Sequence, residues 1–293
     1  MGEAFTRYVR HRLEAGLLLG AYAAFRALPL DIASAIGGWL GRTFGPRFPV
    51  SRRARRNLAR AMPELPVEHI ERIVRGMWDN LGRLLGEYPH LERIAREADR
   101  VEIVNPEVFE MLRREKRGAI LFTGHFANWE MLAHVAKLQG GNYSQVTRMP
   151  NNPLVARALA RLRRMAPEAL VPKGAGGARR SLTVLRRGGW LGMAVDQRMS
   201  DGVALTFFGR EAMTATGMVR LGLRCDSPVI PVQLERLGGC RFRLTMHPPL
   251  LLSRTGDVTA DSATVMAEVN AMLEKWIRAR PEQWLWLHRR WAD

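Results

Sequence analysis

The sequence has few cysteines and no long uninterrupted apolar run. Cys225 and Cys240 are its only two cysteines, they match no metal-site spacing, and they are too few for a disulfide scaffold. This argues against a disulfide-stabilised secreted protein and favours a reducing compartment. The sequence also has no internal repeat and no low-complexity linker. At 293 residues it is long enough to bury a sizeable core, so we expect one large domain, with at most a small appendage.

Acidic residues are scarce relative to basic ones. The chain has 28 Asp and Glu against 45 Lys and Arg, which gives a formal net charge of +17. An excess of this size favours anionic partners, namely nucleic acid, lipid phosphates or an acidic carrier protein. Charge alone does not choose among these three.

The amino-terminal residues are apolar but interrupted. The longest unbroken apolar stretch, residues 15–25, has 11 residues, whereas a spanning helix needs about 20. Arg26, Pro29 and Asp31 separate it from a second apolar stretch at 32–40. We therefore predict a helical, hydrophobic arm over residues 1–48 that lies in or dips into a membrane, followed by a domain over 49–293. The alternative is a helical hairpin packed on the core of the domain itself.

The remainder alternates short apolar runs with helix-length segments. Such alternation predicts an α/β fold with a mainly parallel sheet flanked by helices. Around Leu237 to Gly239 two strand-like runs instead predict a β-hairpin at the end of the sheet. The expected strands are 118–124, 143–149, 169–173, 190–197 and 228–236, and the expected helices are 66–87, 129–139, 153–164, 178–187 and 262–280.

The stretch "LFTGHFANWE", residues 121–130, carries the sharpest chemical signal. His125 falls at the carboxyl end of a predicted strand, and Asn128 is a suitable N-cap for the next helix. A turn between His125 and Glu130 lets the two side chains meet, so that Glu130 fixes the histidine tautomer and the ring acts as a general base. Two alternatives remain open: an ordinary strand-to-helix turn, and pairing of Glu130 with His134 one helical turn later.

Further polar residues follow neighbouring predicted strands and are expected at the same edge of the sheet. Arg148 is suited to binding a phosphate or an oxyanion, with Asn152 nearby as a neutral donor. Asp196, Gln197 and Arg198 close another strand. No G-x-S-x-G turn, phosphate-loop motif or metal-ligand spacing is present, so we predict no covalent acyl-enzyme, no metal and no cofactor.

Several motifs together resemble a known family. "GHFANWE" resembles the H-x4-(D/E) motif of the lysophospholipid-type glycerolipid acyltransferases. Together with "TRMPNNP", "VDQRMSDGVALTFFGR", "MTAT" and "RPEQWLWLHRRW", the chain from about residue 10 onward resembles the lauroyl/myristoyl acyltransferases of lipid A biosynthesis in Gram-negative bacteria. The pair Asp196–Gln197 stands where related acyltransferases carry Glu-Gly-Thr-Arg, which favours the lipid A branch.

The resemblance implies a glycerolipid acyltransferase-like fold at the cytoplasmic face of the bacterial inner membrane. It implies acyl carrier protein as the donor, a 3-hydroxyacyl chain on a Kdo-bearing lipid A precursor as the acceptor, and contact with anionic inner-membrane lipids rather than nucleic acid. His125 and Glu130 match the family's catalytic dyad. Arg148 matches an arginine for oxyanion or phosphate handling, and Asp196 and Gln197 match a substrate-binding motif.

Three rival functions remain at this point. One is acylation of a glycerophospholipid or another glycolipid, and another is a hydrolase that releases the acyl chain to water. The third is a basic protein without enzymatic activity that binds nucleic acid or an anionic membrane; it leaves the His125–Glu130 turn unexplained.

Overall fold

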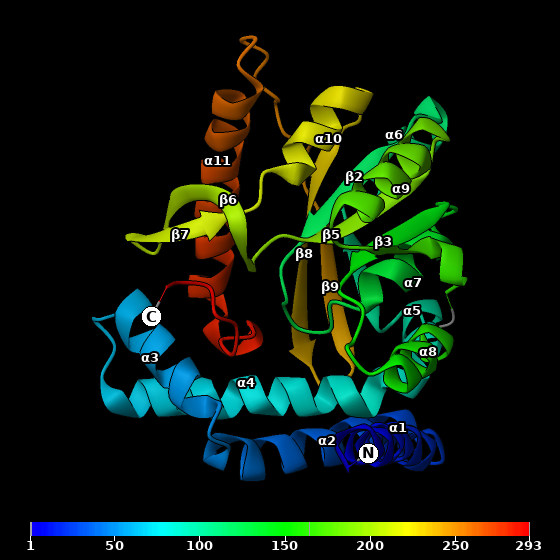
Figure 1. Ribbon diagram of the computed structural model, residues 1–293, viewed down its shortest axis with the longest axis vertical. Helices are drawn as coiled ribbons and strands as arrows, with labels where there is room; N and C mark the ends of the chain where they lie inside the picture. The colour runs from blue at the N-terminus through cyan, green and yellow to red at the C-terminus, as the bar shows by residue number, and fades with distance from the viewer. Residues whose placement is uncertain (1, 164, 293) are drawn as a thin grey trace.

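The computed structural model describes residues 2–163 and 165–292, and Figure 1 shows a sheet with helices on both faces. In the described residues the main sheet has the order β1-β9-β8-β2-β5-β3-β4, and β6 and β7 form a separate antiparallel pair. The strands are β1 (Val101–Val104), β2 (Ala119–Thr123), β3 (Tyr143–Thr147), β4 (Leu170–Pro172), β5 (Trp190–Ala194), β6 (Arg198–Phe207), β7 (Arg210–Thr214), β8 (Val229–Gly238) and β9 (Arg241–Met246).

The α/β fold with a mainly parallel sheet is confirmed. The central strand β2 pairs in parallel with both β5 and β8, and β3 pairs in parallel with β5 and β4. The expected hairpin is the antiparallel pair β8 and β9. It does not end the sheet, because β1 adds a parallel strand outside β9, with Val101 opposite Phe242. The prediction that this hairpin ends the sheet was wrong.

Successive residues of β2 point to opposite faces and join two different clusters of the core. Ile120 and Phe122 pack on the side of α9, α10 and α11, whereas Ala119 and Leu121 pack on the side of α5, α6 and α7. The helices are α1 (Gly2–Arg26), α2 (Leu30–Phe44), α3 (Ser51–Ala61), α4 (Val67–Glu87), α5 (Leu91–Arg96), α6 (Glu107–Glu115), α7 (Met131–Leu138), α8 (Pro153–Leu162), α9 (Ala175–Arg186), α10 (Gly217–Cys225) and α11 (Val258–Ala279).

Helix α4 lies across one end of the sheet, and α2 packs against its other side (Figure 1). Their close approach is made by glycines spaced four apart on both helices, because glycine lets two backbones come into contact. A Cβ added to Gly82 of α4 would stand 2.1 Å from the carbonyl oxygen of Gly37, and one on Gly41 would stand 2.0 Å from that of Trp78. The helices therefore need glycine at these positions.

Replacing Gly82 by alanine is expected to lower the free energy of unfolding by about 1–3 kcal/mol, because the methyl group forces α2 and α4 apart. This loss should appear although alanine has the higher helix propensity. Gly16→Ala in α1 is the matched control, since nothing lies within 4 Å of its added Cβ. Urea denaturation of both variants measures the difference, and equal stability of the two would contradict the packing argument.

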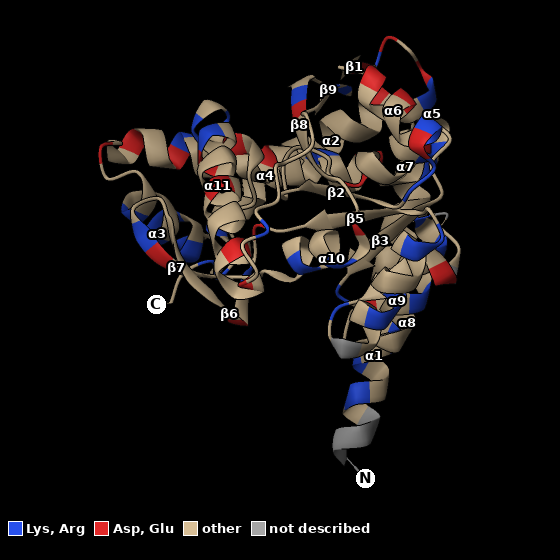
Figure 2. Cartoon of the chain, turned by 90° about the horizontal axis from the view of Figure 1, so that it is seen from above, with Lys and Arg blue, Asp and Glu red and all other residues tan. Residues whose placement is uncertain are grey.

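The hydrophobic arm is helical, as predicted, and consists of α1 and α2. Helix α2 buries Leu30 and Ala33 but leaves Ile36, Trp39 and Leu40 exposed, so it packs on the domain with one face only. Figure 2 shows α1 projecting from the rest of the chain. Among the described residues, no helix is both long enough and apolar enough to cross a bilayer. The division into two domains at residue 48 stays a prediction.

Candidate active site

His125 stands directly beyond the carboxyl end of β2, where the sequence predicted it. Asp196 stands beyond the end of β5, which is paired with β2 in parallel, so the two residues meet at the same edge of the sheet. Asp196 Oδ1 lies 2.7 Å from His125 Nδ1, and Asp196 Oδ2 accepts a hydrogen bond of 2.8 Å from the backbone N–H of His125. The partner of the predicted base is therefore Asp196.

The carboxylate of Asp196 is fully buried and is anchored by a further donor, the indole N–H of Trp284, at 2.8 Å from Oδ2. Burial opposes its ionisation, but the positive charge of His125 and the hydrogen bonds from that residue outweigh burial and hold the pKa of Asp196 below its ordinary value. Asp196 was expected to bind substrate. Both of its oxygens are engaged by the protein, and a role of Asp196 in substrate binding stays a prediction.

Glu130 is also buried, but its partner is a different residue. Arg163, which follows α8, donates from Nη2 to Oε1 of Glu130 at 2.8 Å and from Nε to Oε2 at 3.1 Å. This bidentate pair uses both carboxylate oxygens. The direct hydrogen bond that we expected between Glu130 and His125 was therefore wrong, because each side chain has a better-placed partner of its own. A catalytic role for Glu130 stays a prediction.

The turn that carries His125 is fixed by two hydrogen bonds at Ala127. Ala127 has a positive φ of 46°, a conformation that is unfavourable for a residue with a Cβ. Its backbone N–H donates to the carbonyl of Gln283 at 2.9 Å, and its carbonyl accepts from the side chain of Asn80 at 3.1 Å. These two bonds fix the turn, so His125 is presented by a rigid element.

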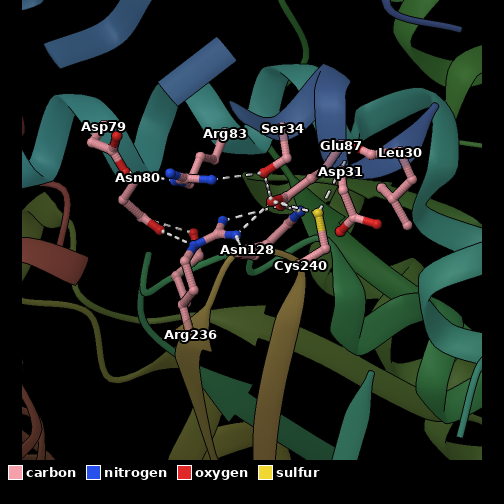
Figure 3. A network of polar contacts seen from close by, with 12 residues as sticks. Leu30, Asp31, Ser34, Asp79, Asn80, Arg83, Glu87, Asn128, Arg236 and Cys240 are labelled. Carbon is pink, nitrogen blue, oxygen red and sulfur yellow. Dashed lines mark hydrogen bonds and ion pairs between the residues drawn. The ribbon is translucent and has the colours of Figure 1, made fainter. Parts of the chain in front are cut away.

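Asn128 belongs to the same support and does not cap a helix. Its Nδ2 donates to Glu87 at 2.8 Å in the buried network of Figure 3, and the helix α7 begins after Glu130 without a side-chain cap. Glu87 is fully buried and also accepts hydrogen bonds from Arg236 and Ser34. The N-cap expected at Asn128 was therefore wrong.

Asn152 has a structural position rather than an open one. Its Oδ1 accepts from the backbone N–H groups of Leu154 and Val155 and caps α8. Its Nδ2 donates to Glu14 at 2.8 Å and to the carbonyl of His11 at 2.9 Å, which ties α8 to α1. Both polar atoms of Asn152 thus have partners within the protein, and its role in substrate binding stays a prediction.

The other predicted binding residues differ in position. Gln197 lies next to His125: its Nε2 is 3.4 Å from Nε2 of His125, and its Oε1 accepts a hydrogen bond of 3.2 Å from Lys173 Nζ. Arg148 is exposed after β3, and Arg198 is exposed at the start of β6. After desolvation, the charge of Arg148 is a further cause that lowers the pKa of Lys173. Roles for Arg148 and Arg198 in binding stay predictions.

Sequence reasoning did not assign Lys173 or His288 to the site. Lys173 directly follows β4, and its place at the end of a predicted strand could have indicated a site residue. The glycine-rich residues after it drew attention to a phosphate-loop motif instead. The ring centroid of His288 is 4.7 Å from that of His125, and its ring nitrogens lie 3.4 and 3.5 Å from Gln197 Nε2. His288 is in the carboxy-terminal tail, where no local pattern indicates a meeting with β2.

His288 is held neutral. Burial, followed by the positive charge of His125, lowers its pKa to about 4 from an ordinary value near 6.5. Between those two pH values the unfolded chain binds a proton that the folded chain does not. The stability contribution is therefore absent above pH 6.5 and increasingly unfavourable as the pH falls towards 4.

The lowered pKa of His288 should reduce the free energy of unfolding by ~3 kcal/mol between pH 6.5 and pH 4 in the unmodified protein. His288→Gln should lack that part of the pH dependence, whereas His69→Gln, at an exposed position of α4, should keep it. Urea denaturation across the pH range measures all three proteins. Identical pH dependence in the unmodified protein and His288→Gln would contradict a neutral buried His288.

His125, Asp196 and His288 also lie close enough together to be weighed as metal ligands, with ligand atoms within 4.8 Å of one another. The donor set does not fit that use. Asp196 already accepts N–H groups at both oxygens and is bonded to Nδ1 of His125, which leaves His125 Nε2 and one ring nitrogen of His288. Two neutral nitrogens are fewer than the three protein ligands of a catalytic zinc site, so we derive no metal-dependent step.

A cavity of about 290 Å³ is lined by Gln197, the residue next to His125. Gln197 and Lys173 stand at its polar side, and Met193, Met218 and Leu221 are among the apolar residues that line it. The carboxylate of Asp196 favours the tautomer with the proton on Nδ1, and in that tautomer the other ring nitrogen of His125, which faces Gln197, is the one available to accept a proton. A base beside an apolar cavity suits the deprotonation of a hydroxyl next to a fatty chain.

Comparison with known proteins gives the family. The model of the bacterial lipid A biosynthesis acyltransferases matches residues 3–293, so the chain belongs to that family. It is also similar to the lipid A biosynthesis lauroyltransferase of Escherichia coli K12, with 29% identity over 280 residues, which cover 90% of this chain and 86% of the relative. The protein is an acyltransferase of lipid A biosynthesis.

Proposed function

We propose that the protein transfers a fatty acyl chain from acyl carrier protein to a hydroxyl of a 3-hydroxyacyl chain on a Kdo-bearing lipid A precursor. Membership of the lipid A acyltransferases and the similarity to a lauroyltransferase support this assignment. The observation that carries the mechanism is the 2.7 Å contact between Asp196 and Nδ1 of His125, which leaves Nε2 as the free basic nitrogen.

In the proposed reaction His125 Nε2 accepts the proton of the acceptor hydroxyl as its oxygen attacks the thioester carbonyl carbon. The C–S bond then breaks, and the leaving thiolate takes the proton from the imidazolium. The products are an ester and the thiol of the carrier, and no acyl-enzyme forms. Asp196 acts by stabilising the imidazolium and by fixing the ring orientation. The amide of Gln197 must give way, since it occupies the approach to Nε2 at 3.4 Å.

Cationic groups near the cavity are suited to stabilising the oxyanion. Lys173 contacts Gln197, which in turn lies next to the base, and Arg148 is close enough to influence the pKa of Lys173. We assign the oxyanion role to this pair of cations together with a backbone N–H group, and we assign to Glu130 the fixing of the turn through Arg163.

Charge and exposed surface support the donor and the location that we propose. A formal charge of +17 steers both an acidic carrier protein and a phosphorylated acceptor towards the chain. The apolar cavity is the proposed site of the acyl chain. The arm exposes Leu13 and Leu17 on α1 as well as the outer face of α2. We therefore propose attachment to the cytoplasmic face of the inner membrane through this arm.

The test is to incubate the purified protein with acyl carrier proteins that bear chains of several lengths, together with a hydroxyacyl-bearing lipid A precursor. Product masses are then read by mass spectrometry. We expect the precursor to gain one acyl chain, with one chain length preferred because the cavity has a limited volume of about 290 Å³. Acylation of an added glycerophospholipid instead would replace the proposed acceptor, and release of free fatty acid without gain of mass by the precursor would indicate a hydrolase.

A further inference from the structure

A second hollow, of about 510 Å³, lies on the other side of the residues that support the catalytic turn. It is bounded by α4, by the end of α2, by the β8–β9 turn and by the short 3-10 helix Pro281–Gln283. Its lining is strongly basic. We call it the arginine hollow after the six arginines that line it: Arg42, Arg72, Arg75, Arg83, Arg236 and Arg280.

Only some of these arginines are neutralised within the protein. Asp79 binds Arg42 and Arg83, in both cases at 2.6 Å. Arg236, which also lines the hollow, is buried and donates to Glu87 and Asn80, as Figure 3 shows. These contacts fix the inner wall, where two carboxylates offset part of the charge of three arginines.

The outer wall is not neutralised in this way. Arg72 and Arg75 are exposed on α4 and make no hydrogen bond or ion pair in the described part of the chain. Arg75 lies near Glu71, but that carboxylate is already bound by Arg55. Arg280 has a carboxylate only at 3.9 Å, on Glu235. Like charges thus converge from segments far apart in the sequence, with Glu282 as the further lining carboxylate.

Guanidinium groups gathered around one concave surface suit a phosphate group, because their planar forks match its oxygens in bidentate pairs. The neighbouring surface indicates what carries the phosphate. Arg42 is in the last turn of α2, the same helix that exposes Trp39 and Leu40. Apolar side chains entering the acyl region of a bilayer would leave adjacent arginines at the level of the headgroups.

We propose that the arginine hollow binds a phosphate group, carried by the headgroup of an anionic membrane lipid. This site is separate from the proposed base, and the proposal does not depend on acyl transfer. It touches the catalytic turn indirectly, because Asn80 lines the hollow and donates to the carbonyl of Ala127. Occupation of the hollow therefore fixes the orientation of the chain at the membrane with the catalytic turn next to the lipid surface.

The test compares Arg72→Ala/Arg75→Ala with Arg114→Ala/Arg224→Ala. Both double variants remove two exposed arginines, and the control pair lies on α6 and α10, at the opposite end of the molecule from α2 and α4 in Figure 1. Binding is measured by sedimentation with phosphatidylcholine vesicles with and without phosphatidic acid. Thermal unfolding verifies that both variants are folded.

We expect the hollow variant to bind phosphatidic acid vesicles at least about tenfold more weakly than the unmodified protein, and the control to stay within about twofold. A loss of the same size in both variants, or no loss in the hollow variant, would overturn the proposal. Calorimetric titration with inorganic phosphate separates the sources. If the unmodified protein binds inorganic phosphate and Arg72→Ala/Arg75→Ala does not, the hollow recognises the phosphate group by itself. If neither protein binds inorganic phosphate but the double variant binds the vesicles more weakly, the hollow recognises the phosphate as part of the lipid headgroup.

Discussion

Replacing His125 by alanine is expected to lower the rate of acyl transfer by about 10³-fold or more. The variant loses the ring nitrogen that we propose as the base, and removal of a general base alone costs about 10²- to 10⁴-fold. Because Asp196 keeps its bonds to the backbone N–H of His125 and to Trp284, the turn should stay in place. The measurement is the initial rate of ester formation with saturating donor and acceptor.

The appropriate control for this variant is His69→Ala, which removes an exposed histidine of α4 and should leave the rate unchanged. Both proteins should show the same unfolding transition and the same binding of the acyl carrier protein. If folded His125→Ala transferred acyl chains at more than about a tenth of the original rate, His125 would not be the base.

The layout of the sheet was predictable because its strands are encoded locally. The apolar runs at 118–124, 143–149 and 190–197 each contain a strand of the structure, and the helices between them are also present. The elements that escaped prediction form through distant contacts. Strand β1 has four residues and pairs with β9, about half the chain away, and β6 shows little alternation of buried and exposed residues. Short or weakly patterned strands have no local signature.

The position of His125 was also predictable from the sequence, but the partner of its ring was not. The strand end at His125 is a local feature, and Glu130 was the nearest carboxylate in the sequence. The carboxylate that reaches the ring depends on the three-dimensional structure. Arg163, 33 residues beyond Glu130, binds both oxygens of Glu130, so that this carboxylate is not available to His125. Asp196 contacts His125 because β5, which precedes Asp196, lies beside β2. Strand order is a property of the whole sheet, so spacing within one turn cannot supply it.

Asp196→Asn is expected to lower the rate of transfer by about 10²- to 10⁴-fold while the protein stays folded. The carboxylate accepts two N–H groups at Oδ2 and the ring N–H at Oδ1. An asparagine that keeps its oxygen on the first two donors points its NH₂ group at Nδ1. That arrangement forces the ring proton onto Nε2, which is then no longer a base. Rate per folded molecule, with the folded fraction from circular dichroism, is the measurement.

Glu130→Gln separates the partner found in the structure from the one suggested by sequence spacing. Neutralising Glu130 leaves Arg163 largely buried without its counter-charge, so we expect a loss of about 3–5 kcal/mol in the free energy of unfolding. Glu130→Gln/Arg163→Met removes both charges and should recover most of the stability and a transfer rate within about tenfold of the original. A folded double variant as inactive as Asp196→Asn would instead show that Glu130 takes part in the reaction. The double variant thus distinguishes a carboxylate that holds the turn from one that acts on the substrate.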